Sequence, residues 1–338
     1  MTVTGTTRPA TGAAPTLFDV VGLSVRVGQR GRSYRVVDEV SFQLTPGRAL
    51  GIVGESGSGK SLTLRALMAL LPGSVRPDGG EVRLDGALIP LSGRGVRAAR
   101  RRRMAMVFQD SLSALNPVQT VGAQIAEVPR KVLGLSRAAA WARAIELLDL
   151  VGLPSPATRA RAYPHQLSGG MRQRVAIAIA LATEPEVLLC DEPTTALDVT
   201  VQAQVLELIR RLRSQLGLAL IFVSHDIAVV QQVCDDIAIM YTGRIVETGP
   251  ASEVLARPLH PYTRALLSAV VDLDDVVGHA RPIPGALPDP SNLPAGCSFH
   301  PRCPLAGPEC RRDPVPLLAV GDNARQAACL HSDQVGGL

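Results

Sequence analysis

The stretch Gly54-Glu55-Ser56-Gly57-Ser58-Gly59-Lys60-Ser61 decides the fold of this chain. A short apolar run, residues 49–53, precedes it, and a helix-forming run, residues 62–71, follows it. Glycines let backbone N–H groups turn inward around phosphate oxygens, and the start of a helix adds a partial positive charge. In this strand, loop and helix context, the pattern predicts a nucleotide site in which Lys60 reaches the β- and γ-phosphates and the Ser61 hydroxyl binds Mg²⁺. The plainer alternative is a flexible Gly/Ser loop before a helix.

The pattern around this loop predicts an α/β fold with a largely parallel sheet. Apolar strand-like runs alternate with helical patterns from Leu17 to Glu247. We therefore expect a P-loop NTPase domain at residues 16–256. Strand signals vanish between about 110 and 183, which predicts an inserted helical subdomain. Residues 1–15 are expected to be disordered, and residues 257–338 to form a short, proline- and cysteine-rich C-terminal extension.

Composition narrows the class of protein further. No apolar run among the 338 residues approaches the roughly 18 to 20 needed to cross a bilayer, so an integral membrane protein is excluded. The N-terminus has no secretory signal pattern, which indicates a protein that stays in the cytosol. Only two of the 35 basic residues are lysines, Lys60 and Lys131, so the lysine in the glycine loop stands out. Six cysteines in a cytosolic chain indicate metal or redox chemistry rather than a disulfide framework.

Two acids complete the predicted nucleotide site. The apolar run 187–190 is followed by Asp191 and Glu192, as expected at the end of a neighbouring strand. Asp191 is predicted to hold the Mg²⁺, directly or through water, and Glu192 to polarise the attacking water. Standing alone, the same pair is as readily an acidic turn after a core strand.

A third motif gives the chain a family resemblance. Ser168, Gly169 and Gly170, within the run Leu-Ser-Gly-Gly-Met-Arg-Gln-Arg at 167–174, are predicted to open a helix whose free N–H groups form an anion site. In register with both earlier motifs, this run resembles the signature sequence of the ATP-binding cassette (ABC) ATPases. The resemblance implies that it closes on the ATP held by the phosphate loop of a second subunit.

Further matches follow in chain order. Gln109 resembles the Q-loop glutamine, whose amide reaches the Mg²⁺ and its water while its loop contacts a membrane partner. Asp198 lies in a run that resembles the D-loop, which communicates across the dimer, and His225 resembles the switch histidine that contacts the γ-phosphate. The chain departs from the family at the aromatic residue that stacks on adenine. The matching position is Val27, and the nearest aromatic, Tyr34, lies later.

Four cysteines of the extension, Cys297, Cys303, Cys310 and Cys329, suit a four-ligand site. Their spacing alone leaves zinc, an iron–sulfur cluster or free thiols open. The arrangement, together with the runs 108–117 and 260–267, resembles ABC ATPase subunits for oligopeptide, dipeptide and nickel uptake. That resemblance implies a [4Fe–4S] cluster on the four cysteines. The neighbouring His300 and His331 are expected to be incidental.

The resemblance also implies a function and partners. The chain is expected to be the ATP-hydrolysing subunit of a multi-subunit ABC importer that takes up peptides, with nickel or another small solute as the alternative. It would work with a second ABC ATPase subunit, in a heterodimer rather than a homodimer, two transmembrane permease subunits and an extracytoplasmic solute-binding protein. We expect it at the cytoplasmic face of a bacterial cell membrane, as a peripheral protein.

A basic run, Arg97 and Arg100 to Arg103, raises the alternative of an ABC ATPase that clamps nucleic acid. Aromatic content is 3%, so a base-stacking platform is missing. The sequence also has neither a long coiled-coil insertion nor tandem cassettes, which such a clamp would require. We therefore predict a solvated arginine-rich loop and no nucleic-acid partner.

Overall fold

The computed structural model describes residues 16–29, 32–93, 100, 102–109, 115–195, 197–269, 283–321 and 325–338. The expectation of disorder for residues 1–15 falls outside these ranges, as do Arg97 and Arg101 of the basic run.

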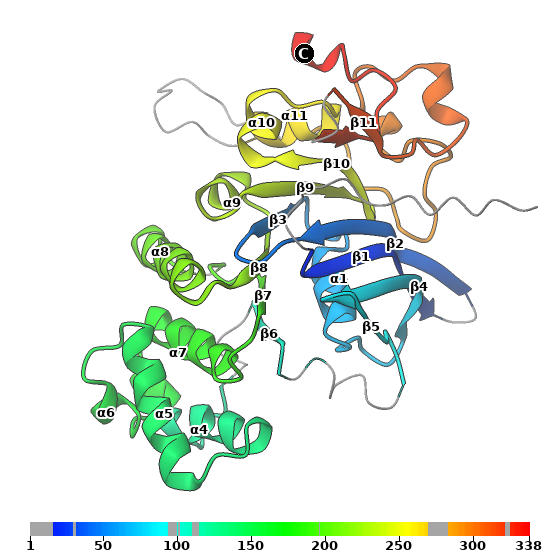
Figure 1. Ribbon diagram of the computed structural model, residues 1–338. Coiled ribbons are helices and arrows are strands. Elements are labelled where there is room, and N and C mark those ends of the chain that lie inside the picture. Colours follow the sequence, from blue (N-terminus) through cyan, green and yellow to red (C-terminus); the bar gives the residue numbers. More distant parts are fainter. Residues whose placement is uncertain are drawn as a thin grey trace, which may run out of the picture.

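The main sheet of eight strands is parallel at its centre and antiparallel at one edge (Figure 1). Every residue of its strands β3 (Ala49–Val53), β7 (Val187–Asp191) and β8 (Ala219–Ser224) is buried. Helices cover one face of these strands, and the helix after the glycine loop together with a second sheet covers the other. The register pairs Val53 with Ser224 and Asp191 with Val223, which brings the carboxyl ends of β3, β7 and β8 to one edge. In spatial order the strands are β11 (Leu318–Val320), β12 (Arg325–Ala327), β10 (Arg244–Pro250), β9 (Asp236–Tyr241), β3 (Ala49–Val53), β8 (Ala219–Ser224), β7 (Val187–Asp191) and β6 (Met104–Val107).

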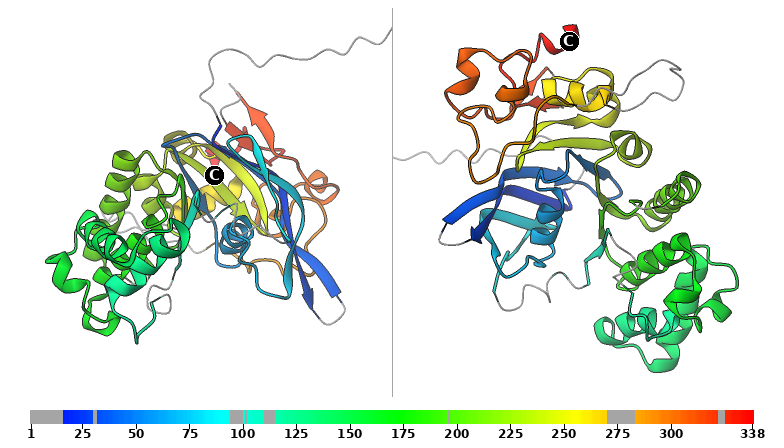
Figure 2. Two further views of the ribbon diagram at one scale, coloured as in Figure 1. Left: turned by 60° about the horizontal axis from the view of Figure 1, so that its bottom comes forward. Right: turned by 180° about the vertical axis from the view of Figure 1, so that it is seen from behind.

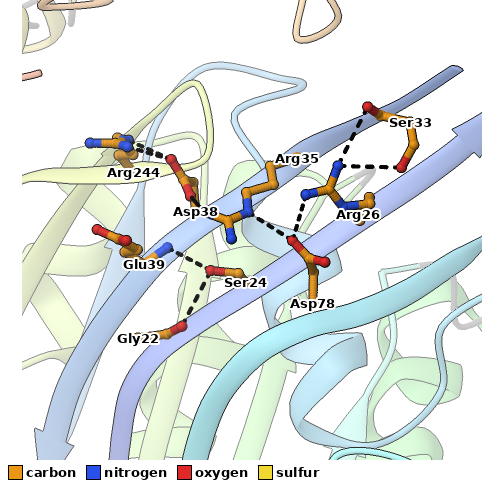
Figure 3. Close-up of polar contacts among 9 residues, drawn as sticks. All are labelled: Gly22, Ser24, Arg26, Ser33, Arg35, Asp38, Glu39, Asp78 and Arg244. Carbon is orange, nitrogen blue, oxygen red and sulfur yellow. Dashed lines mark hydrogen bonds and ion pairs between the residues drawn. The ribbon is translucent and has the colours of Figure 1, made fainter.

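A second, antiparallel sheet lies beside the first. It contains β2 (Arg32–Leu44), β1 (Phe18–Gln29), β4 (Val75–Leu84) and β5 (Ala87–Ile89), in that spatial order. A ladder of charges connects three of its strands to β10 (Figure 3). Asp78 accepts hydrogen bonds from Arg26 (2.9 Å) and Arg35 (2.8 Å), which hold the pKa of its carboxyl at about 2. Asp38 in turn accepts from Arg35 and from Arg244 of β10, each at 2.8 Å, so the ladder ties the two sheets together.

The region predicted as helical contains no strand within its described part, residues 115–183. Its elements are α4 (Val121–Val132), α5 (Arg137–Leu150), α6 (Pro156–Arg159), the 3-10 turn η1 (Pro164–Gln166) and α7 (Gly169–Leu181). This group and the C-terminal extension lie at opposite ends of the main sheet, as Figures 1 and 2 show. The remaining helices are α1 (Lys60–Leu67), α8 (Val199–Leu216), α9 (Ile227–Val233), α10 (Ala251–Ala256) and α11 (Pro261–Ser268). None of the described helices is both long enough and apolar enough to span a membrane.

The C-terminal extension is part of the main sheet. It adds strands β12 and β11 beyond β10, and it contains the 3-10 turns η2 (His300–Arg302), η3 (Pro308–Arg311) and η4 (Val335–Gly337). Glu247 of β10 is fully buried and anchors this attachment. Its carboxylate accepts the backbone N–H groups of Leu259 and His260, both at 2.9 Å, and pairs with Arg325 of β12 at 2.8 Å. Periodicity could not reveal these short strands, because three residues are too few to show it.

The prediction of a solvated arginine loop is wrong for Arg100, one member of the basic run. Arg100 is 1% exposed and donates to the carbonyl of Pro90 at 2.9 Å, and burial lowers its pKa to about 10. Arg103 forms an ion pair with Glu186, just before β7. Both side chains thus pair with groups of the fold, whereas Arg102 of the same run is exposed.

Candidate nucleotide site

The glycine loop between β3 and α1 has the close backbone approaches that its sequence predicts. A Cβ placed on Gly54 would lie 2.1 Å from the carbonyl oxygen of Met240, so no other residue fits there. Gly59 has φ of 102°, a left-handed conformation at the start of α1 that favours glycine. The loop is therefore folded tightly against the end of β9.

Lys60 lies inside this loop. Its side chain donates from Nζ to the carbonyl oxygens of Gly54 (2.6 Å) and Glu55 (2.9 Å), and the residue is 4% exposed. Burial lowers the pKa of Lys60. A compact ammonium fits this space, whereas the broad planar guanidinium of arginine would not.

Ser61 and Asp191 meet where the loop faces the end of β7. The Ser61 hydroxyl donates to Asp191 Oδ1 at 2.7 Å. Asp191 is 1% exposed, its other oxygen, Oδ2, is buried without a hydrogen-bond partner, and burial raises its pKa. An orphaned carboxylate oxygen beside a hydroxyl is a donor set that a hard divalent cation satisfies, so these residues fit Mg²⁺.

Glu192 follows at the end of β7 and is the point where three side chains converge. Its Oε2 contacts Gln109 Nε2 at 3.0 Å, Thr195 Oγ1 at 2.9 Å and His225 Nδ1 at 3.2 Å. Glu192 is 9% exposed and has φ of 45°, in the left-handed region that non-glycine residues rarely adopt. The structure thus brings together Gln109, Glu192 and His225, which sequence reasoning assigned to one site. The structure adds Thr195 to this group. Its position three residues after Glu192 was the only feature of the sequence that could have indicated the contact.

The predicted signature residues lie elsewhere. Ser168 caps α7, where its hydroxyl accepts the Met171 N–H at 3.3 Å, and it is exposed. A Cβ on Gly170 would lie 2.5 Å from Val201 Cγ1, so the start of α7 packs closely against the start of α8. Asp198, which is exposed, caps α8. In the described part of the chain, no hydrogen bond joins residues 168–170 to residues 54–61. Figure 1 shows α7 and α1 well apart.

The aromatic residue nearest the predicted adenine position lies beside it in the sheet. The register of β1 and β2 pairs Tyr34 directly with Val27, so the two side chains are on the same face of the ribbon. Sequence distance separated them only because the chain turns between these strands.

The four cysteines of the extension gather around one pocket. Cys297, Cys303, Cys310 and Cys329 all line it, and none is in a disulfide. Burial raises the pKa of Cys329 to about 11 and also raises those of Cys297 and Cys303.

A smaller set of ligand-type atoms lies beside this pocket. Within the described ranges, the one group of three such atoms within 4.8 Å of one another is Glu309, Cys310 and His331. His331 was expected to be incidental. Its Nε2 lies 2.8 Å from a carboxylate oxygen of Glu309, the residue before Cys310.

Comparison with known proteins places this geometry in a family. A family model described as "ABC transporter" matches residues 37–195, and one described as "Oligopeptide/dipeptide transporter, C-terminal region" matches residues 246–310. A Brucella abortus protein named as a peptide import ATP-binding protein is 48% identical over 305 residues, covering 90% of this chain and 92% of that protein. A Sinorhizobium fredii protein named as a peptide ABC transporter ATP-binding protein is 45% identical over 328 residues, covering 96% and 98%.

Solved structures agree. The ATP-binding cassette MJ0796 with bound ADP and phosphate is 28% identical, with a TM-score of 0.62, over 70% of this chain and 99% of that one. CbiO1 from Clostridium perfringens is 26% identical, with a TM-score of 0.62, over 72% and 91%. The chain belongs to the ABC transporter family of ATPases, in the group with the oligopeptide/dipeptide transporter C-terminal region. The predicted α/β fold of ABC ATPase type is confirmed.

Proposed function

We propose that this chain is the ATP-hydrolysing subunit of a multi-subunit importer that takes up peptides across the cytoplasmic membrane of a bacterium. The observation that carries the proposal is the convergence of Gln109, Thr195 and His225 on Glu192, next to the Ser61–Asp191 pair. The matched C-terminal region and the peptide-import names of its relatives support peptides over nickel as the solute.

Hydrolysis in this proposal uses the residues at the strand ends. Lys60 moves from the loop carbonyls to the β- and γ-phosphates of ATP, and the backbone N–H groups of residues 54–61 surround the phosphate oxygens. Glu192 accepts a proton from water as the water oxygen bonds to the γ-phosphorus, and the bond from that phosphorus to the bridging oxygen of ADP breaks. Gln109 and His225 position the water and the γ-phosphate. Ser61, Asp191 and Gln109 would hold Mg²⁺, which would supply neutralisation of the phosphate charge.

Ser168, which is exposed, and the half-buried Gly169 and Gly170 supply the second half of the site. The N-terminus of α7 is an anion site that this chain's own phosphate loop does not use. We infer that it contacts ATP on a second ABC ATPase subunit, with Asp198 next to the interface, and that a heterodimer is favoured over a homodimer. The Gln109 segment would then transmit closure to two transmembrane permease subunits. An extracytoplasmic solute-binding protein would deliver the peptide, and the chain would lie at the cytoplasmic face of the membrane.

The transport proposal predicts loss of peptide uptake on deletion of the gene. Cells lacking this chain should lose uptake of radiolabelled peptides, and plasmid-borne wild type, but not the Glu192→Gln variant, should restore it. Nickel uptake, measured in the same strains, should be unchanged. Intact peptide uptake in the deletion strain, with nickel uptake lost, would contradict the peptide assignment.

A metal centre on the four cysteines is a separate proposal, supported by the fact that all four line one pocket. Zinc bound by four thiolates is the alternative, and we propose the [4Fe–4S] cluster because the family resemblance implies it. A bound cluster would fix Cys297, Cys303, Cys310 and Cys329 to one another and stabilise the extension.

Anaerobic purification tests this centre. We expect brown protein with about four iron atoms and matching acid-labile sulfide per chain. Cys303→Ser should lose most of both, whereas Cys234→Ser, at a buried cysteine of the main core, should keep them. One zinc per chain without iron would contradict the cluster.

A further inference from the structure

An arginine of the C-terminal extension contacts the nucleotide loop directly. Arg302, in η2, donates from Nη1 to Glu55 Oε2 at 2.7 Å and from Nη2 to Glu55 Oε1 at 3.0 Å. Glu55 is the second residue of the glycine loop, 247 positions earlier in the chain. Two parallel hydrogen bonds between a guanidinium and a carboxylate fix direction as well as distance.

The rest of the guanidinium is held as firmly. Its Nε donates to the carbonyl of Pro284 at 2.8 Å, and its carbon lies 5.9 Å from the ring centres of both Tyr241 and Phe299. The side chain is 3% exposed. Surface ion pairs contribute little to stability, because water screens the charges and fixing the side chains costs entropy. The Arg302 side chain is instead buried and held in one orientation by its other contacts.

A second contact holds the backbone of the same loop residue. The Tyr262 hydroxyl accepts the Glu55 N–H at 2.8 Å, and Tyr262 is fully buried against Tyr241 and Phe299. Leu287 of the extension also lies over the loop, since a Cβ on Gly57 would be 3.5 Å from it. The loop is therefore clamped at a side chain and at its backbone by residues outside the matched cassette region.

We propose that Arg302 is a positioning residue for ATP binding, which acts through Glu55. The Glu55 carboxylate lies beside the place where a triphosphate must bind, and Arg302 both neutralises it and holds it away from the phosphate cradle. Without the guanidinium, a free carboxylate next to the loop would repel the phosphates, and the first turn of the loop would lose its outer support. This proposal rests on the nucleotide role of residues 54–61.

The test is ATP binding and steady-state hydrolysis by Arg302→Gln in the full chain. We expect Kd and KM for ATP to rise about tenfold and kcat to stay within about twofold, because Arg302 touches no reacting atom. Arg302→Lys, which keeps the charge but loses the paired geometry, should fall in between. The double variant Glu55→Gln/Arg302→Gln should recover to within about threefold of wild type, since the repelling charge is gone.

Two controls in the same extension separate positioning from folding. Arg325→Gln breaks the buried pair with Glu247 and should lower the melting temperature with no rise in Kd while the protein is folded. Arg311→Gln, at an exposed position, should change neither quantity.

Two results would overturn the role of Arg302. One is an unchanged Kd in Arg302→Gln while Lys60→Ala loses binding, which leaves the proposed nucleotide site intact. The other is an equal rise in Kd for Arg302→Gln and for the double variant, because that makes the effect one of folding rather than of charge.

Discussion

Replacing Glu192 with Gln is expected to lower ATP turnover by about a hundredfold or more, while the Kd for ATP stays within about twofold of wild type. The amide cannot accept the proton of the attacking water. Its carbonyl oxygen can still accept hydrogen bonds from Gln109 Nε2 and Thr195 Oγ1, so the shape of the site is kept. Steady-state phosphate release and equilibrium ATP binding measure the two quantities separately.

Glu207→Gln is the matched control for this charge change. Glu207 is exposed on α8, where it pairs with Arg210, and its loss should leave turnover unchanged. Undiminished hydrolysis by Glu192→Gln would contradict the assignment of the base. Equal loss of turnover and of ATP binding would show instead that the variant damages the site as a whole.

Lys60→Ala is expected to weaken ATP binding by at least about thirtyfold. Removing one partner of a buried, hydrogen-bonded charge pair costs about 2 to 5 kcal/mol, and about 1.4 kcal/mol is tenfold in affinity. In the free protein the Lys60 ammonium is bonded to the carbonyls of Gly54 and Glu55, so it is already held inside the loop, from which it moves to the phosphates. The rise in melting temperature that saturating MgATP produces in wild type should be lost.

The only other lysine of the chain provides the control. Lys131 is 72% exposed and pairs with Glu127 one helical turn away, so Lys131→Ala should bind ATP as wild type does. Lys60→Arg should not restore binding, because the space inside the loop suits an ammonium. Full MgATP stabilisation of Lys60→Ala would contradict the nucleotide site itself.

Contiguous motifs were the part of the site that could be predicted from sequence. The residues of the glycine loop are neighbours in the chain, and a strand, a loop and a helix start place them without help from distant segments. The same holds for Asp191 and Glu192, because a buried strand delivers the residues at its end to the edge of the sheet. Gln109 and His225 follow other strands of the sheet, and they were predicted from the family resemblance.

Contacts between distant segments were out of reach. Thr195 was placed only in the run 195–198 that resembles the D-loop, because only the turn after β7 shows that its hydroxyl contacts Glu192. Arg100 was misjudged because composition does not reveal that it donates to the carbonyl of Pro90. Val27 and Tyr34 lie side by side only because β1 pairs with β2, which their separation in the sequence does not show.

By itself the sequence determined the class of fold and the chemistry of the nucleotide loop, because both follow from local patterns of apolar, glycine and charged residues. Only the tertiary structure decided how the cysteine-bearing extension meets that loop. Arg302 reaches Glu55 because the chain after β10 places Tyr262 against Tyr241, the last residue of β9, and Phe299 then packs against both rings. Two residues 247 positions apart become partners through that packing, which no spacing in the sequence records.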